Sequence, residues 1–76
     1  MVQVGNFVKI LVELRAKETD EIIVPAGSVG IVDDIQMGFG GSYVDVIIND
    51  VHFSTHWRSV QVISEEEFRA AYAHRE

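Results

Sequence analysis

The residues whose types could support catalysis lie in one short stretch, His52-Phe53-Ser54-Thr55-His56, which an antiparallel strand carrying Asp45 would face. Histidine, serine and a carboxylate are the groups of a hydrolytic triad. Same-face neighbours on a strand stand about 7 Å apart, however, which is beyond the hydrogen bond that a base makes with its nucleophile. His52 and His56 would be separated by roughly 13 Å, too far to bind one metal ion, unless Asp45 and other groups completed a site. We therefore expect no enzyme, no metal site and no cofactor.

A second candidate is the glycine-rich segment Gly38-Phe39-Gly40-Gly41-Ser42, which resembles a phosphate-binding loop in its glycines. It lacks the lysine and the following helix that give such loops their affinity for anions. Residues 36–42 are predicted to be a flexible connection instead. Met37 and Phe39 make it a candidate contact with a partner, because methionine and aromatic side chains are frequent at binding surfaces.

Length and composition indicate one small domain over residues 1–76, with a sheet over about residues 5–63 and a helix over about 65–75. The chain has 76 residues, 47% of them apolar, and no cysteine, so neither a disulfide nor a thiolate metal site is available. Its start has no basic region followed by an apolar run, as a signal peptide would. No apolar stretch approaches the roughly 20 residues that span a bilayer. We expect a cytoplasmic protein without membrane contact.

The charge balance is strongly acidic. Twelve Asp and Glu residues against six Lys and Arg residues give a net charge of −6. Such a surface repels phosphate backbones, so nucleic acid is an unlikely partner.

Alternating apolar residues predict an all-β fold. The expected extended segments are residues 7–14, with Val8, Ile10, Val12 and Leu14 facing inward, then 21–24, 29–35, 43–48, 51–57 and 60–63. Residues 15–20 are a charged loop. Between the second and third segments, Pro25 and Gly27 predict a type II turn with these residues at its second and third positions. Gly30 lies within a strand pattern, which indicates a bulge or a second backbone passing close by.

Asn49-Asp50 predicts a two-residue hairpin turn, because both residues tolerate positive φ. This turn sets a register in which Ile48 faces Val51, with further pairs at every step along the strands. The inward face then carries Val44, Val46, Ile48, Val51, Phe53 and Thr55, followed by Trp57, which would plug one end of the sheet. The outward pairs are Ile47 with His52, Asp45 with Ser54, and Tyr43 with His56.

A C-terminal helix is predicted to begin after Ser64, which can cap it together with Glu67. Its apolar stripe is Phe68, Ala71 and Tyr72, which would cover part of the sheet. Apolar residues on the outward side of the sheet need such a cover or a partner, and they are Phe7, Leu11, Tyr43 and Ile47. Whatever the helix leaves exposed is a candidate homodimer interface.

The segment Gly27-Ser28-Val29-Gly30-Ile31-Val32 resembles the G-x-x-G-x-V corner of SH3-like barrel families. These include KOW domains of ribosomal and transcription-factor proteins, photosystem I subunit IV, the variable chain of ferredoxin–thioredoxin reductase and the β subunit of nitrile hydratase. The similarity covers roughly Gly5 to Ile63 and implies a small five-stranded SH3-like barrel, here with a short C-terminal α-helix, acting as an accessory or adaptor subunit. KOW domains that bind RNA carry basic residues around this corner, where this chain has Glu21, Asp33 and Asp34.

We expect a non-enzymatic protein-interaction or accessory module that contacts another protein or a second copy of itself. The candidate interaction residues are Phe7, Leu11, Met37, Phe39, Tyr43, Ile47, His52 and His56. The alternatives are a KOW-like RNA-binding domain, a phage or mobile-element inhibitor that binds a basic partner, and a hydrolase using His56, Ser54 and Asp45.

Overall fold

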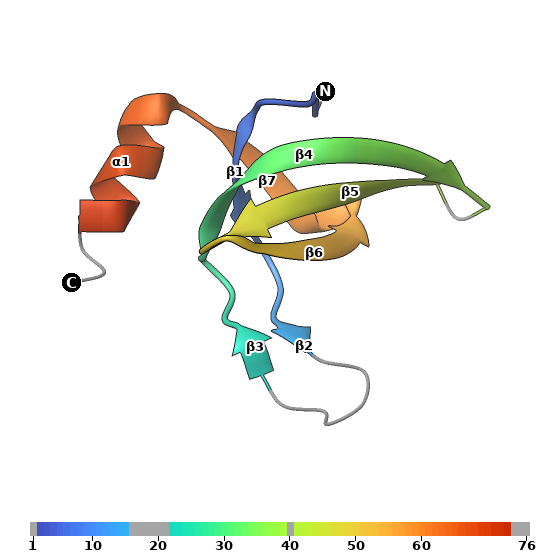
Figure 1. The fold of residues 1–76 in the computed structure, drawn as a ribbon, viewed down its shortest axis with the longest axis horizontal. Coiled ribbons are helices and arrows are strands. Elements are labelled where there is room, and N and C mark those ends of the chain that lie inside the picture. The colour runs from blue at the N-terminus through green and yellow to red at the C-terminus, as the bar shows by residue number, and fades with distance from the viewer. Residues whose placement is uncertain (1, 16–21, 40, 74–76) are drawn as a thin grey trace.

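The computed structural model describes residues 2–15, 22–39 and 41–73. In chain order the elements are β1 (Phe7–Ile10), β2 (Leu14–Arg15), β3 (Ile22–Val24), β4 (Val29–Gly38), β5 (Gly41–Ile48), β6 (Val51–His56), the 3-10 helix η1 (Trp57–Ser59), β7 (Val60–Ile63) and α1 (Glu65–Ala73). Figure 1 shows the strands as a curved sheet with α1 at one side of it. The predicted all-β fold with a short C-terminal helix is confirmed.

Five strands form one antiparallel sheet in the order β6-β5-β4-β1-β7. The long strand β4 joins its two halves. Residues 29–31 of β4 pair with β1, and residues 31–38 pair with β5. A register shift between Val32 and Asp34 places a bulge at Asp33, and bulges bend the strand that carries them. The bend therefore lies just after β4 passes from one neighbour to the other.

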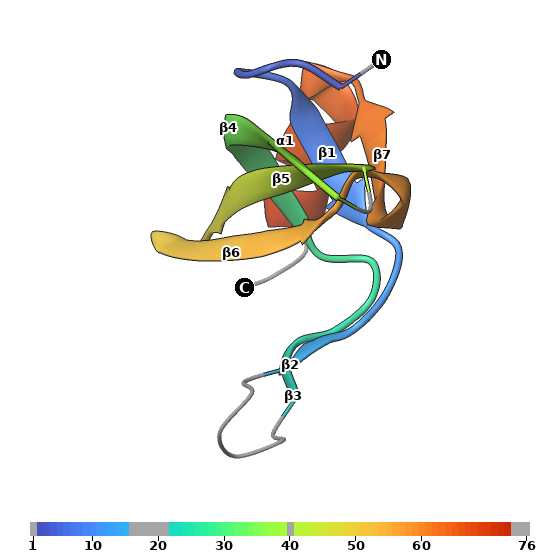
Figure 2. The same cartoon turned by 90° about the vertical axis from the view of Figure 1, so that its right-hand side faces the viewer.

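The predicted first strand is interrupted. The chain leaves the sheet after Ile10, and β2 pairs with β3 in a separate two-stranded arm that projects from the sheet (Figure 2). The backbone N–H of Leu11 donates to the carbonyl oxygen of Ser59 at 2.8 Å, one step beyond the pair of Ile10 with Val60, and this is the last bond before the chain departs for the arm. The inward position predicted for Val12 is wrong, because its side chain is 44% exposed. Of the predicted charged loop, residues 16–20 lie outside the described residues.

The turn before β4 forms as predicted, with one change in its register. The backbone N–H of Ser28 donates to the carbonyl oxygen of Pro25, and Gly27 has a φ of +95° at the third position. Pro25 therefore occupies the first position of the turn and not the second. The Gly27 N–H donates to the Ile10 carbonyl oxygen at 2.7 Å, which ties the turn to the end of β1.

The β5–β6 hairpin has the predicted turn and the predicted register. Asn49 and Asp50 have φ values of 52° and 65°, and the six cross-strand pairs run from Ile48 with Val51 to Tyr43 with His56. The predicted inward face is buried only in part. Val44, Val46, Ile48 and Thr55 are buried, Phe53 is half-buried, and Val51 is exposed at the turn.

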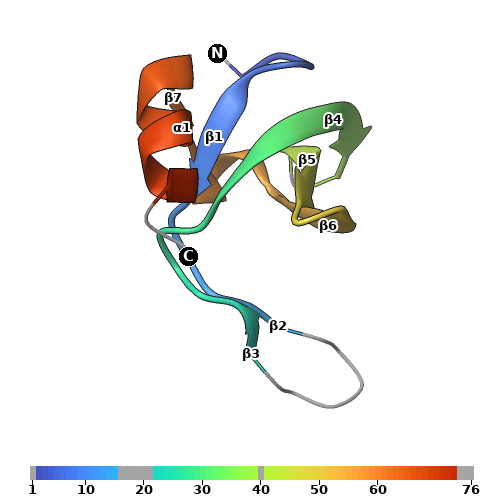
Figure 3. The same cartoon turned by 60° about the vertical axis from the view of Figure 1, so that its left-hand side comes forward.

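The helix α1 begins where its sequence predicts. The backbone N–H of Glu67 donates to Ser64 Oγ at 3.0 Å, which is the expected N-terminal cap. The ring of Phe68 lies 4.6 Å from the ring of Phe7, so α1 packs against β1, and it also contacts β4 (Figure 3). Lys9 Nζ of β1 reaches the Glu67 carboxylate at 3.5 Å. The side chain of Tyr72, the third member of the predicted stripe, lies outside the described residues.

The core is aliphatic, and its buried side chains come from β1, β3, β4, β5 and β7. Its members are Val8, Ile10, Val24, Val32, Val44, Val46, Ile48 and Val60, with Val2, Leu14, Ile35 and Phe53 packed against them. Among the described residues, no helix has the length and apolar character needed to cross a bilayer.

Candidate functional site: an apolar groove beside the β4–β5 hairpin

The β4–β5 hairpin is longer than its glycine content predicts. Residues 36–42 were expected to form a flexible connection, and this is wrong, because Gln36 and Met37 continue β4 and pair with Tyr43 and Ser42 of β5. Next to its tip, the hairpin lies close to the end of β6 and to η1. A Cβ atom on Gly41 would lie 3.1 Å from a ring nitrogen of His56 and 3.5 Å from the indole nitrogen of Trp57. Gly38 pairs with Gly41, so the strands continue almost to the hairpin tip.

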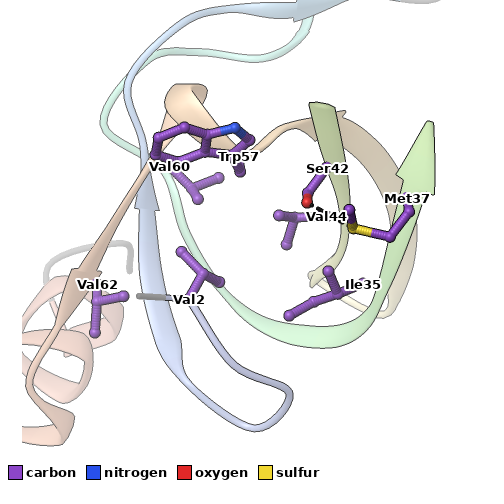
Figure 4. A pocket seen from close by; sticks show the side chains of 8 residues that line it. All are labelled: Val2, Ile35, Met37, Ser42, Val44, Trp57, Val60 and Val62. Atoms are coloured by element: carbon purple, nitrogen blue, oxygen red, sulfur yellow. Dashed lines mark hydrogen bonds between the residues drawn. The ribbon is translucent and has the colours of Figure 1, made fainter. Parts of the chain in front are cut away.

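A groove of about 730 Å³ opens beside this hairpin. Figure 4 shows its lining side chains around the space between the β4–β5 hairpin and β7. The lining residues come from five parts of the chain and are Val2, Ile35, Met37, Ser42, Val44, Trp57, Val60 and Val62. Seven of these eight described residues are apolar and none carries a charge, so the groove they form can bind apolar groups.

Strand alternation places these side chains together. Ile35 pairs with Val44 and Met37 pairs with Ser42, so four side chains share one face of the hairpin. Val60 and Val62 share one face of β7 in the same way. Val44 and Val60 are buried, and they make the floor of the groove a continuation of the core.

The rim of the groove is open to solvent. Exposed fractions are 82% for Met37, 44% for Trp57 and 45% for Val62. The hydroxyl of Ser42 donates to the sulfur of Met37 at 3.1 Å, and this contact orients the methionine beside the groove (Figure 4). The plug predicted for Trp57 is not formed, because the indole lies half-exposed at the rim and not inside the sheet.

One side of the groove is closed by the N-terminal segment. The N–H of Gly5 donates to the Val32 carbonyl oxygen at 2.9 Å, and the Val32 N–H donates to the Asn6 carbonyl oxygen at 3.0 Å. The N–H of Gln3 donates to the side-chain oxygen of Asn6 at 2.8 Å. These bonds hold the segment against β4, and Val2 packs onto the core beside Ile35.

The guanidinium of Arg58 lies next to the rim. Its Cζ stands 5.4 Å from the centre of the Trp57 ring system, within the range of a cation–π interaction. The backbone N–H of Arg58 donates to His56 Nδ1 at 3.2 Å, so the imidazole caps η1 and orients Trp57. His56 thus has a structural role at the groove.

The residues that resemble a triad lie on β5 and β6 in the predicted register, with Asp45 opposite Ser54, and the contacts of their side chains include other partners. Asp45 accepts a hydrogen bond from the side-chain nitrogen of Gln36 at 3.1 Å, while His52 Nδ1 lies 3.7 Å from a carboxylate oxygen of Asp33. The ring of His56 stands edge-on to Tyr43 at 5.6 Å. Within the described residues, no group of three or more His, Asp and Glu side chains is placed to hold a metal ion.

The predicted interaction residues fall into separate neighbourhoods. Phe7 packs against α1, Leu11 is exposed where the chain leaves β1, and Ile47 is half-buried opposite His52. Met37 lines the groove, and Phe39 lies at the tip of the hairpin that forms one of its walls.

Sequence reasoning missed the groove as a unit. The sequence contains one clue to the groove: two pairs of apolar residues spaced two apart, Ile35 with Met37 and Val60 with Val62. All four side chains line it. The long-range pairing that brings these strands together is not visible in either segment alone.

Comparison with known proteins gives no family for this chain. No family model matches it, and neither a curated protein nor a solved structure matches it. The resemblance to SH3-like barrels therefore stays a prediction.

Proposed function

We propose that the chain is a non-enzymatic protein-interaction module that binds an extended apolar segment of a partner protein in the groove between the β4–β5 hairpin and β7. The observation that carries the proposal is an open groove of about 730 Å³ whose floor is core and whose rim exposes Met37, Trp57 and Val62. A contiguous apolar surface of this kind usually marks a binding site, because leaving it in water is unfavourable.

The strand edge beside the groove supports an extended ligand. The pairing of β4 with β1 ends at Ile31, and the N-terminal segment bonds to the next residue, Val32. Among the described residues no strand lies along that edge beyond Val32. An extended peptide can add to such an edge through its main chain and place alternate side chains in adjacent pockets. The side-chain carboxylate of Asp34 accepts the backbone N–H of Ile35 at 2.9 Å, so this N–H is not free to bond to an added peptide. The segment from Met37 to the hairpin tip is the part that remains for pairing.

Charge favours a basic partner protein. Lys9 faces Glu67, and Arg69 pairs with Glu65 on α1, so these two cations are already neutralised by carboxylates. The net charge of −6 attracts positively charged partners and accelerates their association at low salt. The same charge opposes the RNA-binding alternative, because phosphate binding requires cations that displace counterions. A soluble accessory role in the cytoplasm fits the proposal.

Trp57 provides a direct test, because it is the only tryptophan in the chain and it lines the groove. Random peptides displayed on phage are selected against the protein, and the selected peptides are synthesised and titrated while Trp57 emission is recorded. We expect peptides with apolar residues two apart and flanking Lys or Arg, and a shift of the emission to shorter wavelength on binding.

The matched variants are Val62→Glu and Gln61→Glu. They add the same carboxylate at neighbouring positions of β7, but only Val62 lines the groove. We expect Val62→Glu to weaken peptide binding at least tenfold and Gln61→Glu to leave it almost unchanged. Selected peptides that bind both variants equally and leave the Trp57 emission unchanged would refute the groove as the binding site.

A further inference from the structure

Phe39 has no cover within the described part of the chain. It lies in the connection between β4 and β5, and its side chain is fully exposed to solvent. Met37, two residues earlier, is 82% exposed and lines the groove. A large aromatic ring and an open apolar groove therefore belong to the same hairpin.

We propose that this groove is filled by the hairpin tip of a second copy, so that Phe39 of each protomer enters the groove of the other. The inference rests on the binding groove proposed above and names its occupant. In a two-fold symmetric dimer the same surface patch serves both partners, so the inserted group and its receiving site must lie close together on one chain. The β4–β5 hairpin meets this condition, because the groove-lining residues Met37 and Ser42 flank the tip on either strand.

The charges of the chain allow this contact. Two protomers that each carry a net charge of −6 repel one another, and close approach requires a surface without facing carboxylates. The groove lining contains no charged residue. Between Asp34 and Asp45 the sequence is also free of charge, so neither the tip nor its receiving site brings an acid to the interface.

The available area predicts a weak dimer. A large aromatic side chain buries about 150 to 250 Å². The inserted ring of each protomer and the groove surface that it gives to its partner together amount to about 300 to 500 Å² per protomer. Stable interfaces bury about 800 Å² per partner. We therefore expect reversible association that a tighter-binding apolar segment of another protein displaces. The interface differs from the outward patch expected from the sequence, in which Phe7 is instead covered by α1.

The test is sedimentation velocity of the full chain over a dilution series from about 1 mM to about 1 μM, the range in which weak dimers dissociate. The wild type should change from dimer to monomer across the series. Phe39→Ser removes the inserted ring, and Val62→Glu places a charge in the receiving groove. Each variant alone should remain monomeric, with an unchanged far-ultraviolet circular dichroism spectrum.

Val51→Ser is the matched control, since Val51 is also an exposed apolar residue beside a hairpin turn, at the opposite end of β5. It should associate like the wild type. The decisive sample is an equimolar mixture of Phe39→Ser and Val62→Glu. There the intact Phe39 of the second variant can enter the intact groove of the first. The mixture keeps one of the two insertions, so it should associate more weakly than the wild type but measurably more than either variant alone.

A wild type that stays monomeric throughout, a dimer that persists in Phe39→Ser, or a mixture that associates no more than the two separate variants at about 1 mM would each overturn the inference. These outcomes are separable from failure of the proposed function. Peptide binding at Trp57 without self-association leaves the groove as a site for other proteins only. Self-association through Phe39 without any selected peptide leaves the groove as a dimer interface only.

Discussion

A Cβ atom on Gly30 would lie 2.5 Å from the carbonyl oxygen of Ile47, closer than real side chains approach backbone. The same atom would lie 2.7 Å from side-chain carbons of both Val46 and Ile48. Gly30 pairs with Val8 of β1 just before β4 turns to pair with β5. The absence of a side chain at this position therefore allows the two halves of the sheet to meet.

Gly30→Ala should lower the free energy of unfolding by about 2 to 3 kcal/mol or more, because the added methyl group meets backbone that cannot move alone. Urea unfolding measures the change. The control is Gly38→Ala, where the nearest atom is a ring carbon of Tyr43 at 3.1 Å that can move with its side chain. That variant should lose less than about 1 kcal/mol. Equal losses for the two variants would contradict the close packing assigned to Gly30.

The β5–β6 turn offers a stabilising change. Asp50 has a φ of 65°, a conformation that is unfavourable for a residue with a side chain. Asp50→Gly creates the Asn-Gly pair preferred in two-residue turns. Glycine also increases the conformational entropy of the unfolded chain, which offsets part of the gain, so we expect the free energy of unfolding to rise by roughly 0.5 kcal/mol. Asp50→Ala lacks this benefit and should destabilise by about 1 kcal/mol. Thermal unfolding of both variants checks the opposite signs.

The N-terminal cap of α1 stabilises the protein, so we expect its removal to lower the free energy of unfolding and a different capping residue at position 64 to restore it. Ser64→Ala removes the acceptor for the Glu67 N–H and should cost about 1 kcal/mol, with a weaker helical signal at 222 nm. Ser64→Asp supplies a carboxylate acceptor at the same place and should restore most of the stability. If alanine and aspartate behave alike, the Ser64 side chain does not cap the helix.

Local signals predicted much of the fold. Asn49-Asp50 set the register of β5 and β6 correctly because a two-residue turn leaves no freedom in the pairing that follows. Ser64 predicted the start of α1 because the capping bond joins two residues only three positions apart, Ser64 and Glu67, and is therefore visible in the local sequence. Gly30 predicted a close approach of a second backbone. A glycine inside a strand weakens it, so its presence there usually marks a bulge or a closely packed neighbour.

Long-range pairing limited the rest. Leu11 to Leu14 continue the alternation of β1, yet β2 pairs with β3 instead, and Val12 becomes exposed. The glycines around Phe39 suggested a loose connection, while β4 and β5 pair as far as Gly38 and Gly41, where the hairpin lies close to β6 and η1. The groove depends on both effects, which is why single residues such as Met37 were identified from the sequence and the site was not.

The pairing of Phe7 with Phe68 decides how α1 is held. A helix of nine residues is not stable alone in water, so its order depends on packing against the sheet. The rings lie 4.6 Å apart at an angle of 38°. Each single alanine variant should lower the free energy of unfolding by about 2 kcal/mol, less than for a fully buried phenylalanine, since both rings are half-buried.

The double variant separates contact from simple loss of apolar area. Because the two rings touch, Phe7→Ala combined with Phe68→Ala should cost roughly 0.5 to 1.5 kcal/mol less than the sum of the single losses. The reference pair is Phe68→Ala with Phe39→Ala, whose exposed ring lies at the hairpin tip, and these losses should add. Urea unfolding of the two cycles provides the comparison. Additive losses at Phe7 and Phe68 would mean that α1 does not dock on β1 in solution.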